Sequence, residues 1–168
     1  MTEQLEWIRA VVHEYERALI LYAAGILGDR DRAHDVVQDA FMKLCTQDKE
    51  RVEKRLKSWL FTVCRNRALD IRRKEKAMSH FGGESAMGYA SPDPTPPAAL
   101  EQRESASRVL LLLDALPARQ REAVRLKFQH GLSYREIGAV MNASVANVGV
   151  LIHTGIKTLR SKLALNEA

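Results

Sequence analysis

The sequence predicts an all-α protein made of two small helical domains joined by a flexible Pro- and Gly-rich linker. Apolar residues recur at steps of three and four residues before and after the middle of the chain, which is typical of amphipathic helices. Four of the five prolines lie within residues 92–97, where neither a helix nor a central strand can continue. The 168 residues, 46% of them hydrophobic, are sufficient for packed cores.

Three helices are expected in the N-terminal domain, residues 1–78. Apolar side chains repeat along the first helix, which ends at Gly28 and Asp29, and Asp29 or Asp31 can serve as the next N-cap. The repeating residues are Leu5, Ile8, Val12, Tyr15, Leu19, Tyr22 and Ile26. The second helix covers about residues 32–46 and turns one apolar side inward. That side consists of Ala33, Val36, Val37, Ala40, Phe41 and Leu44.

The third helix, residues 56–76, follows a polar connector and is amphipathic. Its inner side is expected to hold Leu56, Leu60, Val63 and Ile71, with Trp59 and Cys64 beside them. Residues 49–76 carry 11 basic and 4 acidic side chains, net +7, and self-repulsion opposes such a concentration unless a polyanion neutralises it. Trp59 and Phe61 would offer surfaces on which an unpaired base could stack, although Trp59 is expected to belong to the core rather than to such a platform. The segment therefore indicates a nucleic acid, locally opened, with a solvated surface helix as the open alternative.

The outer side of the second helix is acidic. Asp31, Asp35 and Asp39 follow one another at four-residue intervals, with Gln38 adjacent. Acidic side chains are favourable near a helix N-terminus, but this line runs along the whole helix. It could meet a basic protein partner or simply face solvent, and the residues alone leave both open.

The linker is expected to cover residues 79–104. Its 26 residues would reach about 85 Å fully extended, against roughly 70 Å for two turns of duplex DNA. It could therefore let two modules grip successive stretches of one DNA molecule.

The C-terminal domain, residues 105–168, is expected to end in a helix-turn-helix. An apolar helix stops at Pro117, and a second covers about residues 118–130. The first contains Val109, Leu110, Leu112, Leu113 and Leu116, and the second Val124, Leu126 and Phe128. Ser133 and Glu136 form a capping-box pattern, and Ser144 caps the last helix after a short turn. In such a motif the second helix enters the major groove of DNA.

Other classes of protein lack support in the sequence. No run of about 18 apolar residues exists, so no membrane insertion is expected. The acidic N-terminus does not resemble a secretory signal, which favours a cytoplasmic protein. Cys45 and Cys64 are interpreted as small buried residues in a reducing compartment. No nucleotide loop, zinc spacing or nucleophile motif is present, so we expect no cofactor, metal or catalytic site.

Three segments resemble the extracytoplasmic-function group of bacterial sigma factors, in the order and spacing of that family. They are DRAHDVVQDAFMKL (31–44), WLFTVCRNRALDIRRK (59–74) and LDALPARQREAVRLKFQHGLSYREIGAVMNASVANV (113–148). The resemblance implies a non-enzymatic factor that binds core RNA polymerase and directs it to promoters. It also implies that the N-terminal domain recognises and melts the minus-ten element, and that the C-terminal domain reads the minus-thirty-five element. A regulon for stress or envelope signals and an anti-sigma partner would be typical.

The resemblance also assigns candidate residues. Candidate polymerase contacts are Asp31, Asp35, Gln38, Asp39 and Phe41, the last shared with the core. Candidate minus-ten contacts are Lys49, Arg51, Lys54, Arg55, Arg65, Asn66, Arg67, Arg72, Arg73 and Lys74. Residues 49–54 correspond to the loop that captures a flipped base, and Asp70 is expected to bond Arg73 rather than DNA. Candidate minus-thirty-five contacts are Ser133, Tyr134, Arg135, Ser144, Asn147, His153, Lys157 and Arg160.

The last helix departs from the family pattern. Asn147 replaces a threonine, Gly149 and Leu151 stand where basic residues are common, and Thr154 with Gly155 replaces an Arg-Ala pair. The family's usual upstream sequence is therefore not carried over. Each glycine weakens a helix by about 1 kcal/mol relative to Ala. Either another part of the fold approaches closely there, or this helix is less stable.

Two further functions stay open on the sequence. A sigma-like decoy would sequester an anti-sigma factor without binding DNA, but it would not need the net +7 of residues 49–76. An ordinary helix-turn-helix repressor would need neither the acidic helix nor the basic helix that follows it.

Overall fold

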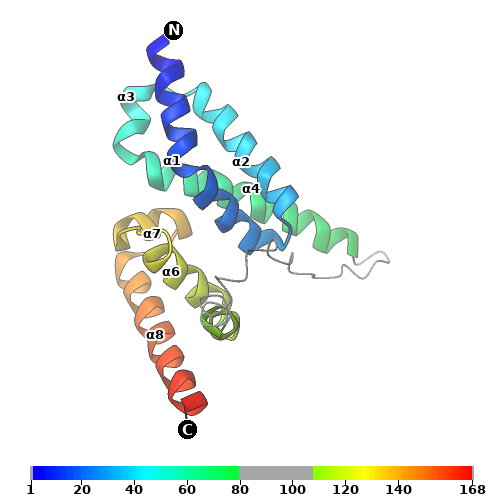
Figure 1. Ribbon diagram of the computed structural model, residues 1–168, viewed down its shortest axis with the longest axis vertical. Coiled ribbons are helices and arrows are strands. Elements are labelled where there is room, and N and C mark those ends of the chain that lie inside the picture. The colour runs from blue at the N-terminus through cyan, green and yellow to red at the C-terminus, as the bar shows by residue number, and fades with distance from the viewer. Residues whose placement is uncertain (1, 80–107, 168) are drawn as a thin grey trace, which may run out of the picture. The chain divides into compact units, whose positions relative to one another are not determined.

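The computed structural model describes residues 2–79 and 108–167, which belong to two compact units of the chain (Figure 1). Every regular element in these ranges is a helix, so the all-α prediction is confirmed for them. The predicted linker, residues 79–104, lies outside the described ranges except for its first residue. In the described ranges no single helix could cross a membrane, and only Tyr134–Met141 with Val145–Leu165, bent by 101°, has the length and hydropathy jointly.

The N-terminal unit consists of α1 (Thr2–Leu27), α2 (Arg30–Cys45), α3 (Lys49–Val52), the 3-10 helix η1 (Glu53–Arg55) and α4 (Leu56–Ser79). Helix α1 packs on α2 and α4, which also contact each other (Figure 1). Gly28 ends α1 with a positive φ of 73°. Of the two candidate N-caps, Asp29 is the one used, because its Oδ1 accepts from the Asp31 N–H at 2.9 Å.

The core of this unit confirms the predicted inner side of α2, because all six of its apolar residues are buried. The prediction for α1 is only partly right. Leu19 and Tyr22 are buried, but Leu5, in the second turn of α1, is 53% exposed. In α4 the prediction is also partly right, because the expected Leu60 and Cys64 are among the buried residues. The buried ones are Leu60, Phe61, Cys64 and Ala68, whereas Leu56, Val63 and Ile71 are half-buried.

Thiol labelling is expected to distinguish the two cysteines. Cys45 is exposed, contrary to the prediction, whereas Cys64 is buried and burial raises the pKa of its thiol from 9.0 to about 12. Because the thiolate is the reactive form, Cys45 should react with an aromatic disulfide at pH 8 and Cys64 only on unfolding. Because the pKa of Cys64 is raised, its protonation does not lower the free energy of unfolding below pH 9.0. The free energy of unfolding falls as the pH rises from 9.0 towards about 12. Equal labelling rates of both thiols in the native protein would contradict this assignment.

The C-terminal unit contains helical residues 108–114, then α6 (Ala118–Phe128), α7 (Tyr134–Met141) and α8 (Val145–Glu167). The predicted capping box is confirmed, since the Glu136 N–H donates to Ser133 Oγ at 3.1 Å and the Ser133 N–H donates to Glu136 Oε1 at 2.9 Å. Asn142, with a φ of 54°, ends α7 in the left-handed region. Ser144 Oγ then accepts from the Asn147 N–H at 3.1 Å and starts α8. The turn between the two helices is therefore formed by local hydrogen bonds.

The core of the C-terminal unit lies between α6, α7 and α8. Its fully buried side chains include Leu126, Leu132, Ile137, Met141, Val148 and Ile152. Phe128, one of the apolar residues of α6, is 64% exposed. It lies about 200° around the helix from Leu126, so the burial of Leu126 turns Phe128 outward.

Alanine substitutions at the two glycines of α8 are expected to have opposite effects. A Cβ on Gly155 would lie 2.9 Å from Val124 Cγ2 of α6, whereas a Cβ on Gly149 would meet Tyr134 Cε2 at an ordinary 3.8 Å. Gly149→Ala should therefore raise the free energy of unfolding by up to about 1 kcal/mol through helix propensity. Gly155→Ala should lower it by about 1 kcal/mol, because overpacking costs about 1–3 kcal/mol. Urea unfolding checks both, and a Gly155→Ala protein as stable as wild type would contradict the close approach.

Candidate functional site

Helix α2 presents an acidic face, which we define as Asp31, Asp35, Gln38 and Asp39. All four side chains are exposed, because the opposite side of α2 carries the buried core residues. Phe41 does not belong to this face. It is only 5% exposed, since it lies on the same side of α2 as buried Val37 and Leu44. The burial of Phe41 confirms that it is shared with the core, and its part in a partner contact stays a prediction.

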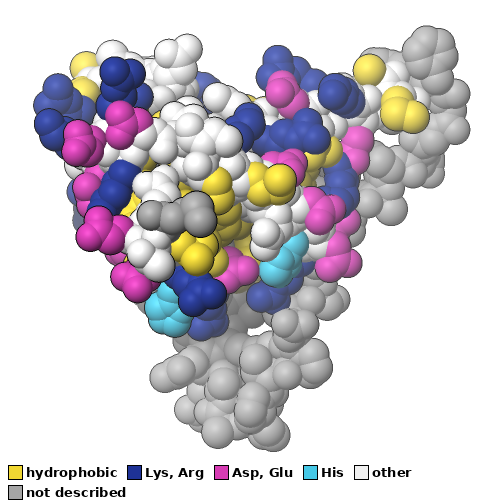
Figure 2. All heavy atoms as spheres, turned by 90° about the horizontal axis from the view of Figure 1, so that it is seen from above, with side chains coloured by type: hydrophobic (Ala, Val, Ile, Leu, Met, Phe, Trp, Pro, Cys, Tyr) yellow, Lys and Arg dark blue, Asp and Glu magenta, His cyan; other side chains and the backbone are white. Residues whose placement is uncertain are grey.

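The basic surface of the N-terminal unit consists of the ten candidate minus-ten residues on α3, η1 and α4. Six of them are exposed, namely Arg51, Lys54, Arg55, Asn66, Arg73 and Lys74, and Lys49, Arg65, Arg67 and Arg72 are half-buried. Figure 2 shows Lys and Arg side chains at several places on the visible face, among them the left and the upper right. The segment that carries the first of these residues differs from the prediction.

Residues 49–55 are helical rather than an open loop. Asp48 caps α3 by accepting from the Glu50 N–H at 3.1 Å, and Val52 is only 2% exposed, so α3 is anchored to the core. The expectation of a polar connector is corrected accordingly, since a buried valine gives this segment a packing energy that composition alone did not indicate. Any base captured here would meet a short helix held in place.

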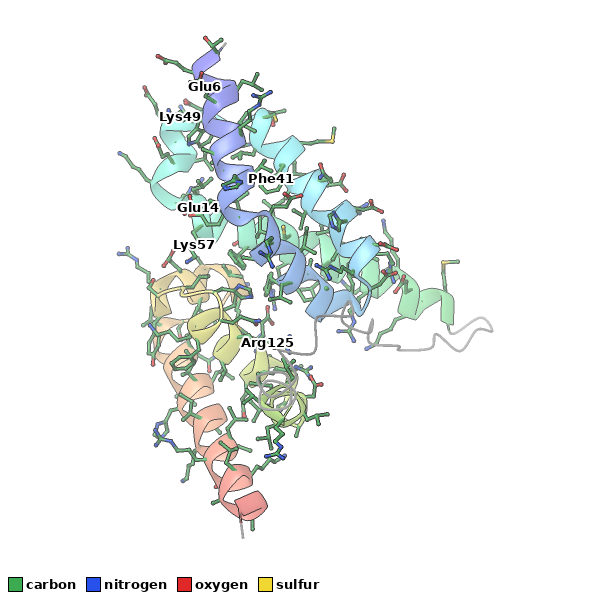
Figure 3. All side chains as sticks on the ribbon, in the orientation of Figure 1. Glu6, Glu14, Phe41, Lys49, Lys57 and Arg125 are labelled. Carbon is green, nitrogen blue, oxygen red and sulfur yellow. The ribbon has the colours of Figure 1, made fainter. Side chains whose placement is uncertain are left out.

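Aromatic residues near the basic surface are arranged differently from the prediction. Phe61 is fully buried and its ring centroid lies 5.1 Å from that of Tyr22, so it cannot stack on a base. Trp59 is half-buried. The aromatic ring beside α3 is Trp7, whose centroid lies 5.7 Å from Lys49 Nζ, at the end of α1 that also carries Glu6 (Figure 3). Sequence reasoning missed this contact because α1 and α3 are not adjacent in the chain.

Ion pairs connect α2 to α4, and one of them joins the acidic face to the basic surface. Arg67 Nε of α4 lies 3.5 Å from Asp39 Oδ2 of α2, and Arg32 of α2 pairs with Glu75 of α4. Within α4, Arg73 donates to Asp70 Oδ1 at 2.7 Å, which confirms the expected Asp70–Arg73 bond. Exposed pairs of this kind contribute about 0–1 kcal/mol each. They orient the side chains but remain weak enough for a partner to replace.

The helix-turn-helix orients the candidate residues of the C-terminal unit. The side chains of Arg135, Asn147, His153, Lys157 and Arg160 are exposed. The Ser133 and Ser144 hydroxyls accept capping hydrogen bonds, so each still has its own O–H to donate. Tyr134, 39% exposed, lies beneath Lys127, whose Nζ is 5.3 Å from its ring centroid. Buried Val148 and Ile152 hold α8 on the unit and leave its opposite side outward.

Among residues 2–79 and 108–167, no three or more His, Cys, Asp or Glu side chains gather in a way that could hold a metal ion.

Family models match both units. The model described as Sigma-70 region 2 matches residues 11–78, and the one described as Sigma-70, region 4 matches residues 106–159. The chain is 32% identical over 149 residues to the ECF RNA polymerase sigma factor EcfG of Rhodopseudomonas palustris, covering 88% of this chain and 77% of the relative. It is 28% identical over 162 residues to the ECF RNA polymerase sigma factor SigL of Mycobacterium tuberculosis, covering 93% and 88%.

A solved structure has a similar fold. The sigma factor RpoE, in complex with the anti-sigma factor NepR from Bartonella quintana, matches with a TM-score of 0.70 at 23% identity. The match covers 93% of this chain and 96% of that chain. At this identity the likeness concerns the fold.

Proposed function

The chain belongs to the extracytoplasmic-function group of the sigma-70 family, whose members direct transcription initiation and are not catalytic, and from this premise we propose which surface performs each step. The acidic face of α2 binds core RNA polymerase, the basic surface of α3, η1 and α4 binds and opens the minus-ten element, and α8 reads the minus-thirty-five element. The observation that carries this proposal is the meeting of an acidic face and a basic surface on one helical unit, linked by Asp39 and Arg67.

The acidic face suits a basic protein partner rather than DNA. Its three carboxylates are exposed and lie along one side of α2, and phosphates would repel them. A cationic surface of the polymerase would gain from the complementary charge, which raises association rates and excludes partners of the wrong sign. Buried Phe41 and its neighbours keep α2 rigid beneath this face.

The basic surface suits DNA that is being opened. Flipping one base out of the stack costs a few kcal/mol, and cationic contacts to the phosphates must offset part of this cost. Neutralising phosphates releases counterions, so the contribution is large at low salt and falls as salt rises. Arg67 is partly neutralised by Asp39 in the free protein. Polymerase contacts with Asp39 would release Arg67 for DNA, which supports tighter promoter binding in the presence of polymerase.

Regulation by an anti-sigma factor is part of the proposal. In the similar solved structure, the sigma factor RpoE is in complex with the anti-sigma factor NepR. We propose an anti-sigma partner for this chain too, and a regulon that answers stress or envelope signals. The site of action is the cytoplasm, where core polymerase and the chromosome meet.

Transcription with purified components tests the proposal. The chain, core polymerase and a genomic library are combined, and RNA ends are mapped at two salt concentrations. We expect discrete start sites and specific gel shifts only when the chain and polymerase are both present. Specific duplex binding by the chain alone would favour a repressor. Capture of an anti-sigma factor without any polymerase or DNA binding would favour the decoy.

A further inference from the structure

The outward side of α8 lacks the side chains that usually read guanine. Residues 144–156 contain no Lys or Arg, and the first cation of the helix is Lys157. Arg or Lys bonded to guanine O6 and N7 is the commonest specific contact in the major groove. The first three turns of α8, which a helix-turn-helix places deepest in the groove, therefore present other chemistry.

Val150 occupies the centre of this side. It is 61% exposed, while Val148 and Ile152 on either side of it are buried in the unit. Two residues correspond to about 200° around a helix, so Val150 points away from the core that they form. Its neighbours on the outward side are the exposed Asn147 and His153. Most of the Val150 surface is not covered by the C-terminal unit as described, so this apolar side chain can contact an apolar group of a ligand.

From these positions we infer that α8 reads a step of A·T base pairs, with Asn147 on adenine and Val150 on the thymine methyl group. The inference rests on the proposed function, because it requires α8 to enter the major groove. Asparagine can bond both N6 and N7 of adenine, and the C5-methyl of thymine is the apolar group exposed in that groove. Residues three apart on a helix have Cβ atoms about 5–6 Å apart, which suits neighbouring base pairs. The lysine and arginine later in α8, Lys157 and Arg160, are left for phosphates.

Base analogues that remove one methyl group or one ring nitrogen from the DNA test this inference. A promoter mapped by the transcription experiment is made with each upstream thymine replaced in turn by deoxyuridine, which lacks only the methyl group. Binding of the chain with core polymerase should fall about fourfold at one position, the value expected for one buried methyl. Val150→Ala should bind the thymine promoter about fourfold more weakly and show no further loss with deoxyuridine there. Replacing the adenine of a neighbouring pair by 7-deazaadenine, which lacks the N7 acceptor, should weaken binding of the wild-type protein. Asn147→Ala should bind both forms of this pair equally.

Val145→Ala is the matched control. Val145 is also half exposed, at 51%, but lies about 140° around α8 from Val150. Its substitution should leave the methyl dependence intact. A promoter indifferent to every thymine methyl, or a Val150→Ala protein that keeps the dependence, overturns the inference while start-site mapping still supports the proposed function. Failure of transcription on the unmodified promoter would contradict both the inference and the proposed function.

Discussion

Charge reversal at Asp35 and Asp39 is expected to lower the affinity for core RNA polymerase by about a hundredfold or more. Both carboxylates are exposed on the acidic face of α2, and replacing them by lysine turns an attraction into a like-charge repulsion. The fold should survive, because the buried side of α2 is unchanged. The Asp39–Arg67 pair, at 3.5 Å and on the surface, is worth only about 0–1 kcal/mol.

The measurement is a titration of labelled core polymerase, with thermal unfolding by circular dichroism as the check on the fold. Glu3→Lys with Glu6→Lys is the matched control, because it makes the same change in net charge at exposed positions of α1. The control should retain wild-type affinity. If the Asp35 and Asp39 variant also retained it, the acidic face would have no part in binding polymerase.

Removal of Arg72, Arg73 and Lys74 is expected to weaken promoter opening at least about tenfold and to flatten the salt dependence. Each phosphate contact contributes about 0.9 to the slope of log affinity against log salt for duplex DNA, so three contacts account for at most roughly 3 units. Because Arg73 already pairs with Asp70 at 2.7 Å, we expect the salt slope to fall by about 2 units rather than by the limit of roughly 3. Permanganate reactivity of unpaired thymines at several salt concentrations measures opening.

A triple variant elsewhere separates local contacts from the net charge. Arg9→Ala, Arg17→Ala and Lys43→Ala removes the same three charges from exposed positions of α1 and α2. This protein should keep nearly the wild-type slope, because long-range effects are screened over about 8–10 Å at ordinary salt. An unchanged slope in the α4 variant would exclude those three residues as phosphate contacts.

The caps of α2, α7 and α8 and the longer helices follow from the sequence because their physics is local. The Ser133–Glu136 box joins groups three residues apart, and Ser144 caps α8 over the same distance. The inner side of α2 is equally local, since a dense apolar stripe at helical spacing leaves one way to bury it. The three resembling segments likewise indicated the family that the comparisons then identified.

Contacts between helices were decided only by the tertiary structure. The sequence could not show that Phe61 packs on Tyr22, that Asp39 meets Arg67 or that Gly155 makes room for Val124. Each of these pairs lies on separate helices, so the contact depends on how the helices cross.

What the sequence by itself determined is therefore the helical character of this protein, its caps, its charged segments and its family. The tertiary structure decided which aromatic residues are buried and which charges oppose one another. For a residue at the edge of an apolar stripe, such as Trp59 or Phe61, the extent of burial depends on whether a neighbouring helix covers it. Periodicity is a property of one helix, whereas burial and ion pairing are properties of two.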